Sequence, residues 1–475
     1  MGVALRWLTV GSCALVLAGC GGGDGPNAGG GQGGTAGSGG TSGAGGTSGN
    51  GGASGSGGAL GGTGGTGTGG AGGTSGVGGT SGAPGAANLF IDPNGGTCKR
   101  SQTQVAYADA SACDSIEAAV AACEPGDVVR IRPGSYPAQN VTSSVATPGS
   151  TVIGEDGVTL AGLTTSGSGL TLRHVTVDVG SGHAAGGWSN SGNDVTLEDV
   201  ALHGSFVSAQ ITGSHVTWRG GELGSAGVTG GKRSCNSGDS EPLQVDHADH
   251  VTIDGVTFHP QDYDPTPCAG SSNGFHLEMV RIDADTNLFT LKNSTFEDGD
   301  HANTASIFIT NVNGDPGDPA NLAFQNNFFG DAENTTFSIH ANVTNCSSFV
   351  FAYNTFHNAP GDPTSNGCTQ SAGMLWIGNL GPRPGYYACA GTHTGNVWQN
   401  DSQYTCGTDK VVVGAQWGHD ALGLGGPDGF HLTTGSPAID AAEAGGYCSS
   451  SLGARDHDGD TRPKGSSCDA GADEM

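Results

Sequence analysis

Basic residues are scarce in this chain of 475 residues, which has 16 Lys and Arg against 44 Asp and Glu and a formal net charge of −28. So acidic a surface favours neither nucleic acid nor other polyanions as partners. The sequence also has no phosphate-binding loop and no H-E-x-x-H, and nucleotide-dependent chemistry is not expected. Its 13 cysteines include no C-x2-C pair, so a structural zinc site is not expected either.

Residues 21–87 have few side chains other than those of Gly, Ser, Thr and Ala. A segment so poor in apolar groups cannot bury enough surface to offset its chain entropy. The composition therefore predicts a disordered, flexible tether with an r.m.s. reach on the order of 45 Å. The rest of the chain, 88–475, is expected to fold as one domain.

The first 20 residues contain an apolar run that follows Arg6 and ends in Leu17-Ala18-Gly19-Cys20. The run is too short to remain in a membrane as a spanning helix. It resembles a bacterial lipoprotein signal, and the resemblance implies cleavage before Cys20 and a lipid on its sulfur. An ordinary secretory signal is the alternative. We expect the protein in the cell envelope, on the outer membrane if there are two membranes, or outside the cell, with only the lipid contacting the membrane.

An eight-residue pattern, here called the octad, recurs along the predicted domain and is apolar at its first, third and eighth positions. Copies begin at residues 170, 195, 216, 251, 289, 322 and 349. The middle pair is mostly polar or glycine, which indicates two short strands joined at a bend. A short-strand repeat of about 20 to 40 residues is typical of a solenoid, in which each coil buries its apolar face against the next. The sequence thus predicts an all-β solenoid.

The start of the domain, 88–136, contains a strand pattern and then a short amphipathic helix capped by Asp114 or Ser115. A Pro-Gly-Asp turn, the strand VVRIR and a Pro-Gly-Ser-Tyr turn follow. In this order of elements the chain resembles the right-handed parallel β-helix proteins of the pectin-lyase-like group. The resemblance implies a right-handed parallel β-helix over 88–475, with an N-terminal capping helix over one end. We expect it to be a monomer.

The end of the chain, about 430–475, resembles a closing element of secreted bacterial β-helix proteins, through FHLTTGSPAIDA and ARDHDGDTRP. Asp456, Asp458 and Asp460 also have the one-three-five spacing of a calcium-binding loop. The glycine and glutamate that such a loop has at its sixth and twelfth positions are missing. Calcium is the one cofactor that the sequence suggests, and a purely structural turn is the alternative.

Eleven cysteines lie in the predicted domain, which suits an oxidising compartment. Cys98, Cys113 and Cys123 compete for one bridge, and we expect Cys123 to be a buried free thiol on the helix. Sequence spacing does not fix connectivity, but pairing neighbours in order predicts the following disulfides: Cys98–Cys113, Cys235–Cys268, Cys346–Cys368, Cys389–Cys406 and Cys448–Cys468.

The segments just before the octads alternate in polarity, so every second side chain should face outward. On successive coils the outward positions are predicted to be Asp246, Glu278, Thr310 and His340, with Gln244, His276, Phe308 and Ser338 beside them. Asp246 and Glu278 would then lie about 5 Å apart, one strand spacing. Two carboxyl groups at that distance have separated pKa values, as glycoside hydrolysis requires.

His276 and His340 are candidates for proton transfer, and Arg281 is a candidate for holding a sugar carboxylate. The acidic segment 298–301 is a second candidate site. The simpler interpretation of both is that outward strand positions are polar for solubility.

The hypothesis from sequence is a tethered, surface-exposed β-helix that binds extracellular polysaccharide along a sheet face. Whether it is an enzyme stays open. The resemblance implies a polysaccharide lyase, a glycoside hydrolase or an epimerase if it is one. A non-catalytic adhesion or structural protein of the cell surface is the alternative.

Overall fold

The structure is a computed structural model that describes residues 85–475 with interruptions. The stretches left out are 146–148, 181–185, 205–206, 225–232, 235–240, 260–262, 265–277, 298–304, 312–316, 331–334, 358, 362–366, 383–388, 400–405, 413–423, 426–429, 443–446, 449 and 451. Several predictions concern residues outside the described part, namely the signal with Cys20, most of the tether, Cys235, Cys268, His276 and the segment 298–301.

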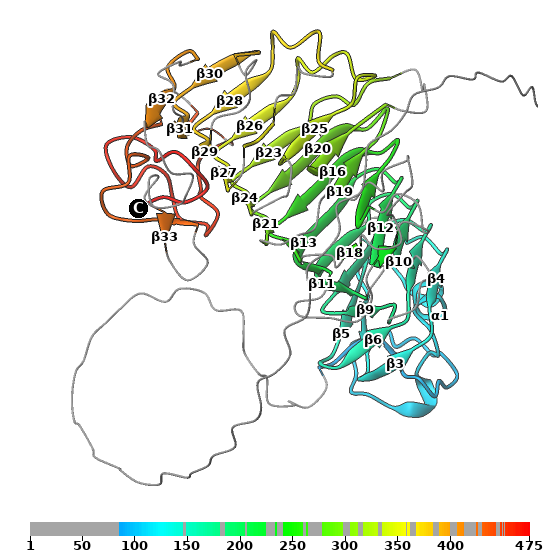
Figure 1. Cartoon of the computed structure of the whole chain (residues 1–475). Coiled ribbons are helices and arrows are strands. Elements are labelled where there is room, and N and C mark those ends of the chain that lie inside the picture. The colour runs from blue at the N-terminus through cyan, green and yellow to red at the C-terminus, as the bar shows by residue number, and fades with distance from the viewer. Residues whose placement is uncertain are drawn as a thin grey trace, which may run out of the picture. The chain divides into compact units, whose positions relative to one another are not determined.

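The largest sheet in the described part of the chain is parallel and has 22 strands arranged in two arms (Figure 1). The first arm contains β1 (Leu89–Ile91), β2 (Val128–Ile131), β5 (Ser150–Gly154), β8 (Leu170–Arg173), β11 (Thr196–His203), β13 (Val216–Leu223), β16 (Asp249–Asp254), β20 (Asn287–Lys292), β23 (Ala323–Gln325), β26 (Val350–Ala352), β28 (Leu375–Ile377) and β30 (Thr392–Thr394). The second arm contains β3 (Gly134–Tyr136), β6 (Val158–Leu160), β9 (Thr176–Asp178), the second halves of β11 and β13, β17 (Thr257–Phe258), β21 (Thr295–Phe296), β24 (Phe328–Phe329), β27 (Thr355–Phe356), β29 (Leu380–Pro382), β31 (Val397–Gln399) and β32 (Lys410–Val412).

A second parallel sheet, with eight strands, completes the coils. Its strands are β4 (Gln139–Val141), β7 (Leu163–Thr165), β10 (Gly186–Asn190), β12 (Val207–Ile211), β15 (Leu243–Val245), β19 (Glu278–Ile282), β22 (Ala305–Ile309) and β25 (Phe337–Ile339). Two short pairs stand apart from both sheets, β14 (Arg233–Ser234) with β18 (Tyr263–Asp264), and β33 (Leu424–Gly425) with β34 (His431–Leu432). Long parallel sheets with almost no helix are the architecture of a parallel β-helix solenoid, as predicted.

Each octad supplies one strand to each arm, and the bend between them is a residue with positive φ. This residue is the fifth of the octad: His174, Asp199, Gly220, Gly255, Asn293, Asn326 and Tyr353. The octads pair in register, so that Leu197 lies between Leu172 and Trp218 in the stack of third positions. The first, third and eighth positions are all buried, and each such side chain stabilises the fold by roughly 1.5–3 kcal/mol. The predicted role of the octad as a core-building repeat is confirmed.

Two further coils follow that the apolar pattern alone did not reveal. Gly378 and Gly395 occupy the bend position in these coils, and Trp376 pairs with His393 between them. They continue a ladder of buried asparagines at the sixth octad position. Its members are Asn327, Asn354, Asn379 and Asn396, each of which donates through Nδ2 to the next, and Asp409 accepts from the last.

A single α-helix among the described residues, α1 (Ile116–Ala122), packs at the start of the coils, after a 3-10 turn, η1 (Asp109–Ser111). Ser115 is its N-cap and accepts a hydrogen bond from the Ala118 N–H. Ile116, Ala119 and Val120 enter the main hydrophobic core. No helix in the described part of the chain is long and apolar enough to cross a membrane.

Four of the predicted cysteine pairs are disulfides in the structure: Cys98–Cys113, Cys346–Cys368, Cys389–Cys406 and Cys448–Cys468. Cys123 is a free thiol, as expected. It is only half-buried, however, because it lies at the C-cap of α1 and not on the helix itself. Burial raises the pKa of this thiol.

The described residues of 430–475 are here called the closing element. They form β34 and a series of turns that lie against the second arm near β24, β27 and β29 (Figure 1). The Phe430 ring stacks on Phe328 with centroids 5.1 Å apart, and the Ala472 N–H donates to Thr355 Oγ1 at 2.9 Å. Arg462 is buried with Glu474, and their ion pair measures 3.4 Å. This buried pair accounts for the arginine of the Arg-Pro sequence and the glutamate of the Asp-Glu sequence in the closing element.

Candidate functional site

A row of outward-facing side chains runs along the eight-stranded sheet, one from each coil. The strand register aligns these residues in the order Asn140, Thr164, Ser189, Gln210, Gln244, Arg281, Phe308 and Ser338. The first four are exposed and the last four are half-buried. Because neighbouring strands lie about 4.8 Å apart, these side chains form a straight array along the solenoid. We call it the outer row.

The predicted pairing of Asp246 with Glu278 is wrong. Val245 is paired with Ile282, so Asp246, the next residue, lies beside Asp283. Glu278 is paired with Ala305 and is buried, with 1% of its surface exposed.

The physical reason is the register of the segment 274–283. We expected Phe275 and Leu277 to face the core, whereas Val280 and Ile282 do so. The two choices differ by an odd number of residues, and such a slip exchanges the two faces of a strand. Both choices bury two apolar side chains, so hydrophobic alternation alone could not distinguish them.

Arg281 is the centre of a hydrogen-bonded cluster on the outer row, which we call the Arg281 cluster. Its Nε donates to Asp283 Oδ1 at 3.0 Å and its Nη1 to Glu241 Oε1 at 2.8 Å. Gln244 Nε2 donates to the other Asp283 oxygen at 2.8 Å. Burial opposes the charge of Arg281, but the hydrogen bond to Glu241 and the charge of Asp283 raise its pKa. Two carboxylates therefore already neutralise the guanidinium that we expected to hold a sugar carboxylate.

Asp246 forms an acid–imidazole pair with the next residue. The distance from His247 Nδ1 to Asp246 Oδ1 is 2.6 Å, and His247 Nε2 lies 3.9 Å from Asp285 Oδ2. His340, which we expected to assist, is three coils away from Asp246 in the register and contacts Phe308 instead, with ring centroids 6.1 Å apart. The predicted catalytic residues that the structure describes, Asp246, Glu278, Arg281 and His340, thus do not converge on one point.

A second polar network, which sequence reasoning missed, lies at the end of the second arm. His259 Nε2 is 2.7 Å from a Glu222 oxygen, and its Nδ1 is 2.8 Å from Glu297. The other Glu222 oxygen bonds to His203 Nε2. Burial opposes the charge of His259, but hydrogen bonds to both glutamates raise its pKa, while those from His203 and His259 lower the pKa of Glu222 to about 2. Three of these residues directly follow an octad: His203, His259 and Glu297. Extending the repeat by a ninth position would have revealed them.

The three aspartates of the predicted calcium loop do not converge either. Asp456 is buried and accepts the Asp460 N–H, whereas the Asp460 carboxylate pairs with Lys464 at 2.6 Å. Asp458 instead meets His431 at 3.0 Å. Burial raises the pKa of Asp456 to about 6. The residues present do not fit a calcium ion held by this loop, because their carboxylates turn toward three different partners.

No protein-family model matches the chain, and no curated protein matches it. Solved structures to which it is similar include an alginate lyase from Paenibacillus, with a TM-score of 0.35 and 14% identity over 62% of this chain and 92% of that chain. A mannuronan C-5 epimerase A-module from Azotobacter vinelandii has a TM-score of 0.36 and 13% identity, over 63% of this chain and 82% of that chain. A rhamnogalacturonan lyase has a TM-score of 0.34 and 14% identity, over 65% of this chain and 87% of that chain. Similarity at this level carries no information on substrate or reaction.

Proposed function

We propose that the folded domain binds an extracellular polysaccharide along the outer row. A straight array of side chains with one residue per coil matches the shape of a linear polymer. The amides and hydroxyls of the row can form hydrogen bonds with sugar hydroxyls, and the half-buried Phe308 offers an apolar surface to a sugar ring. The observation that carries the proposal is the Arg281 cluster, because it fixes the side chains of two neighbouring coils in one orientation on that row.

The net charge of the Arg281 cluster restricts the class of glycan that we expect to bind. The cluster contains one cation, Arg281, and two carboxylates, Glu241 and Asp283, and Asp246 adds a third carboxylate nearby. A polyuronate would meet net negative charge here, which disfavours its approach unless a cation intervenes. We therefore expect neutral glycans to bind better than uronates.

A reaction on the bound polymer would use Asp246 and His247, whose 2.6 Å contact places a carboxylate against an imidazole. Such a pair can transfer a proton in a lyase, a hydrolase or an epimerase. Non-catalytic adhesion is the second candidate function. It is favoured by the wide spacing of the outward acids and histidines along the row, since they do not surround one reacting atom.

The binding proposal is tested with Arg281→Ala and Gln244→Ala on a panel of neutral and uronate glycans, by calorimetry and glycan arrays. We expect each variant to bind the best glycan about tenfold more weakly, a loss of about 1.4 kcal/mol. Arg219→Ala is the matched control, because Arg219 is an outward arginine between two acids, Glu198 and Asp254, on the first arm. Its binding should equal that of the unaltered protein.

Two results would contradict the proposal: no glycan bound by the unaltered domain, or equal affinity in Arg281→Ala, Gln244→Ala and the control. Circular dichroism shows whether each variant is folded. If Arg281→Ala does not fold, the affinity of Gln244→Ala still decides the test. Asp246→Asn separates the two candidate functions. If Asp246→Asn still binds the glycan but no longer turns it over, Asp246 takes part in the reaction. If the unaltered protein binds the glycan without turning it over, adhesion is favoured.

We also propose that the domain is held at the cell surface by a lipid on Cys20 and by the Gly-rich tether. This rests on Leu17-Ala18-Gly19-Cys20 and on the composition of 21–87.

A further inference from the structure

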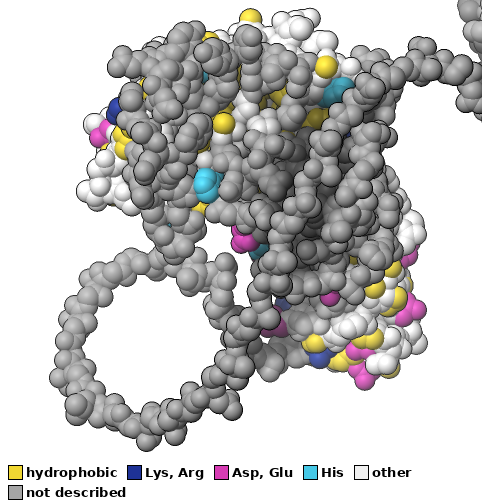
Figure 2. All heavy atoms as spheres, in the orientation of Figure 1, with side chains coloured by type: hydrophobic (Ala, Val, Ile, Leu, Met, Phe, Trp, Pro, Cys, Tyr) yellow, Lys and Arg dark blue, Asp and Glu magenta, His cyan; other side chains and the backbone are white. Residues whose placement is uncertain are grey.

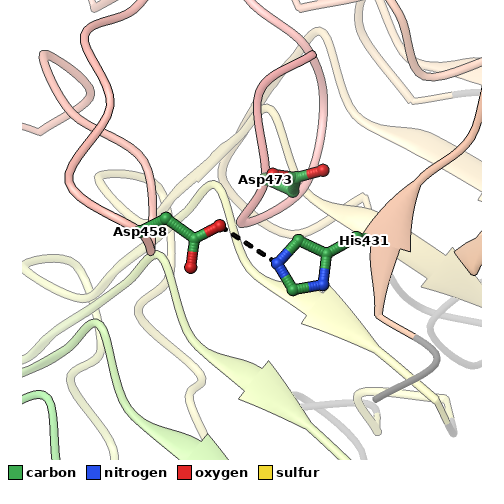
Figure 3. Close-up of side chains that lie close together, drawn as sticks. All are labelled: His431, Asp458 and Asp473. Atoms are coloured by element: carbon green, nitrogen blue, oxygen red, sulfur yellow. Dashed lines mark hydrogen bonds and ion pairs between the residues drawn. The ribbon is translucent and has the colours of Figure 1, made fainter. Parts of the chain in front are cut away.

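Three side chains of the types that bind metal ions meet within the closing element. They come from separate segments: His431 from β34, Asp458 from a turn, and Asp473 from near the end of the chain (Figure 3). One ligand atom from each lies within 4.8 Å of the other two. The intervals of 27 and 15 residues between them show that the fold, and not local sequence, brings them together.

The buried member of this set has an oxygen without a partner. Asp473 is 7% exposed, and its Oδ2 accepts the Leu432 N–H at 2.8 Å. Its Oδ1 has no hydrogen-bond or ion-pair partner among the described residues. Figure 3 shows the Asp473 carboxylate above the His431 ring, with Asp458 close to the same ring. Oδ1 is therefore available to a metal ion, which would offset the cost of burying most of this carboxylate.

The charges of the set are also unbalanced. Asp458 contacts His431, whose Nε2 is 3.0 Å from Asp458 Oδ2, and neither aspartate pairs with Lys or Arg in the described part of the chain. The nearby cations are used elsewhere: Lys464 pairs with Asp460, and Arg462 with Glu474. Two carboxylates against one histidine leave a net negative charge that a divalent cation would neutralise.

We propose that His431, Asp458 and Asp473 bind a divalent transition-metal ion, zinc or manganese. Imidazole nitrogen combined with carboxylate oxygen suits these ions, whereas calcium prefers oxygen ligands alone. In a tetrahedral zinc site with bonds of about 2.0 Å, ligand atoms lie about 3.3 Å apart. His431 and Asp458 already meet this distance. The other separations, which are at most 4.8 Å, have to shorten by up to about 1.5 Å. Asp458 can adjust because its side chain is 47% exposed.

The ion would cross-link separate segments of the closing element, which packs on the coils. Its three ligands connect β34, the turn at Asp458 and the last residues of the chain. The His431 ring lies 5.7 Å from the ring of Phe328 on β24, and Phe430 stacks on the same ring. Metal binding would therefore stabilise the contact between the closing element and the second arm. This role is independent of the glycan proposal, since the outer row belongs to the other sheet.

The test uses tag-free mature protein treated with EDTA and then given ZnCl2, MnCl2 or CaCl2, each alone. We expect Zn²⁺ or Mn²⁺ to raise the melting temperature saturably with one ion bound per chain in calorimetry, and Ca²⁺ to have little effect. Asp458→Asn and His431→Gln should each weaken binding at least about tenfold. Asp460→Asn is the matched control, because Asp460 lies two residues from Asp458 but pairs with Lys464. It should bind the ion like the unaltered protein.

The chain has 15 histidines, so binding of zinc alone proves nothing. Equal affinity in Asp458→Asn, His431→Gln and Asp460→Asn would overturn the proposal, and so would the absence of any stabilisation by Zn²⁺ or Mn²⁺. Asp458→Asn is an exposed, nearly isosteric change, so its melting temperature without metal shows that it is folded. A metal response lost in this variant and kept in the control supports the site.

Discussion

At the scale of single residues, His259 shows how position decides protonation. It is 4% exposed, and each of its ring nitrogens faces a carboxylate, Glu222 on one side and Glu297 on the other. Both nitrogens must carry a proton to donate to these acceptors, so the ring is an imidazolium in this arrangement. With His203, the network connects four neighbouring coils, since the adjacent residues Leu202, Leu223, Phe258 and Phe296 are paired in that order.

We predict that His259→Gln destabilises the domain by about 1–3 kcal/mol near pH 5.5, because it removes hydrogen bonds to charged groups. The folded pKa of His259 is raised above 6.5, so its contribution is complete below 6.5 and is lost as the pH rises through the folded value. The folded pKa of Glu222 is lowered from 4.5 to about 2, so its contribution is present above 4.5 and is lost on acidification. Both contributions are present from about pH 4.5 to 6.5.

Urea unfolding at pH 5.5 and pH 9 measures the effect. The cost of His259→Gln should be larger at pH 5.5. The control is His250→Gln, which removes an exposed histidine paired with Asp249 at 2.7 Å and should cost less than about 1 kcal/mol. A cost of His259→Gln that does not change with pH would show that the ring is neutral in the fold.

At the scale of the elements, each octad position has its own ladder. The fourth position alternates in sign along the first arm, with Arg173, Glu198, Arg219, Asp254 and Lys292 joined by ion pairs. The sixth position changes from apolar residues in the early coils to asparagine in the late ones. Opposite charges on neighbouring strands stabilise the pairing, whereas like charges would oppose it. These ladders specify register in addition to the apolar positions.

We predict that Asn379→Ala destabilises the late coils by at least about 3 kcal/mol, because it leaves several buried polar groups without partners. Asn379 is fully buried, and its Nδ2 donates to Asn396 Oδ1 and to the Phe351 carbonyl. Its Oδ1 accepts from the backbone and side chain of Asn354.

Hydrogen exchange by mass spectrometry measures this prediction coil by coil. Protection of β28 to β31 should fall in Asn379→Ala, while that of β5 to β9 should not, since neighbouring coils carry most of the coupling in a solenoid. Asn342→Ala, at an exposed position, is the control and should change protection little. Uniform loss of protection along all coils would show that the solenoid unfolds as one cooperative unit.

These ladders also explain which parts of the fold and of the candidate site could be predicted from the sequence. The octads predicted both arms and their bends, because the first, third and eighth positions are apolar in every copy found. The coil at Gly378 escaped notice because Gly381 stands at its eighth position, and the coil at Gly395 because Gly391 and His393 stand at its first and third positions. The asparagine at the sixth position was nevertheless a usable signal. On the eight-stranded sheet the single strand of each coil is short, so two alternations fitted 274–283 and the predicted partner of Asp246 was wrong. The set His431, Asp458 and Asp473 depends on tertiary contacts and has no local pattern.

At the scale of the whole molecule, charge separates the folded domain from the rest of the chain. Before residue 88 the only charged residues are Arg6 and Asp24, whose charges cancel, so the net charge of −28 belongs to the domain. On the face shown in Figure 2, acidic and histidine side chains are visible and Lys and Arg side chains are few. An anionic lipid surface repels such a domain. A tether with a reach on the order of 45 Å would let it stay away from the membrane that anchors it.

The proposed anchor therefore predicts that the lipid, and no protein surface, holds the molecule at the membrane. In a bacterium with two membranes, the unaltered protein should incorporate an alkyne-labelled fatty acid and partition into Triton X-114, and its mature form should begin at Cys20. Cys20→Ala should lose the label, whereas Cys13→Ala, which changes another cysteine of the same segment, should keep it. High salt should not release the labelled protein, because no electrostatic contact holds an acidic domain to an anionic surface. An unlabelled protein with an N-terminus other than Cys20 would identify an ordinary secretory signal instead, and the polysaccharide proposal would then apply to a secreted domain.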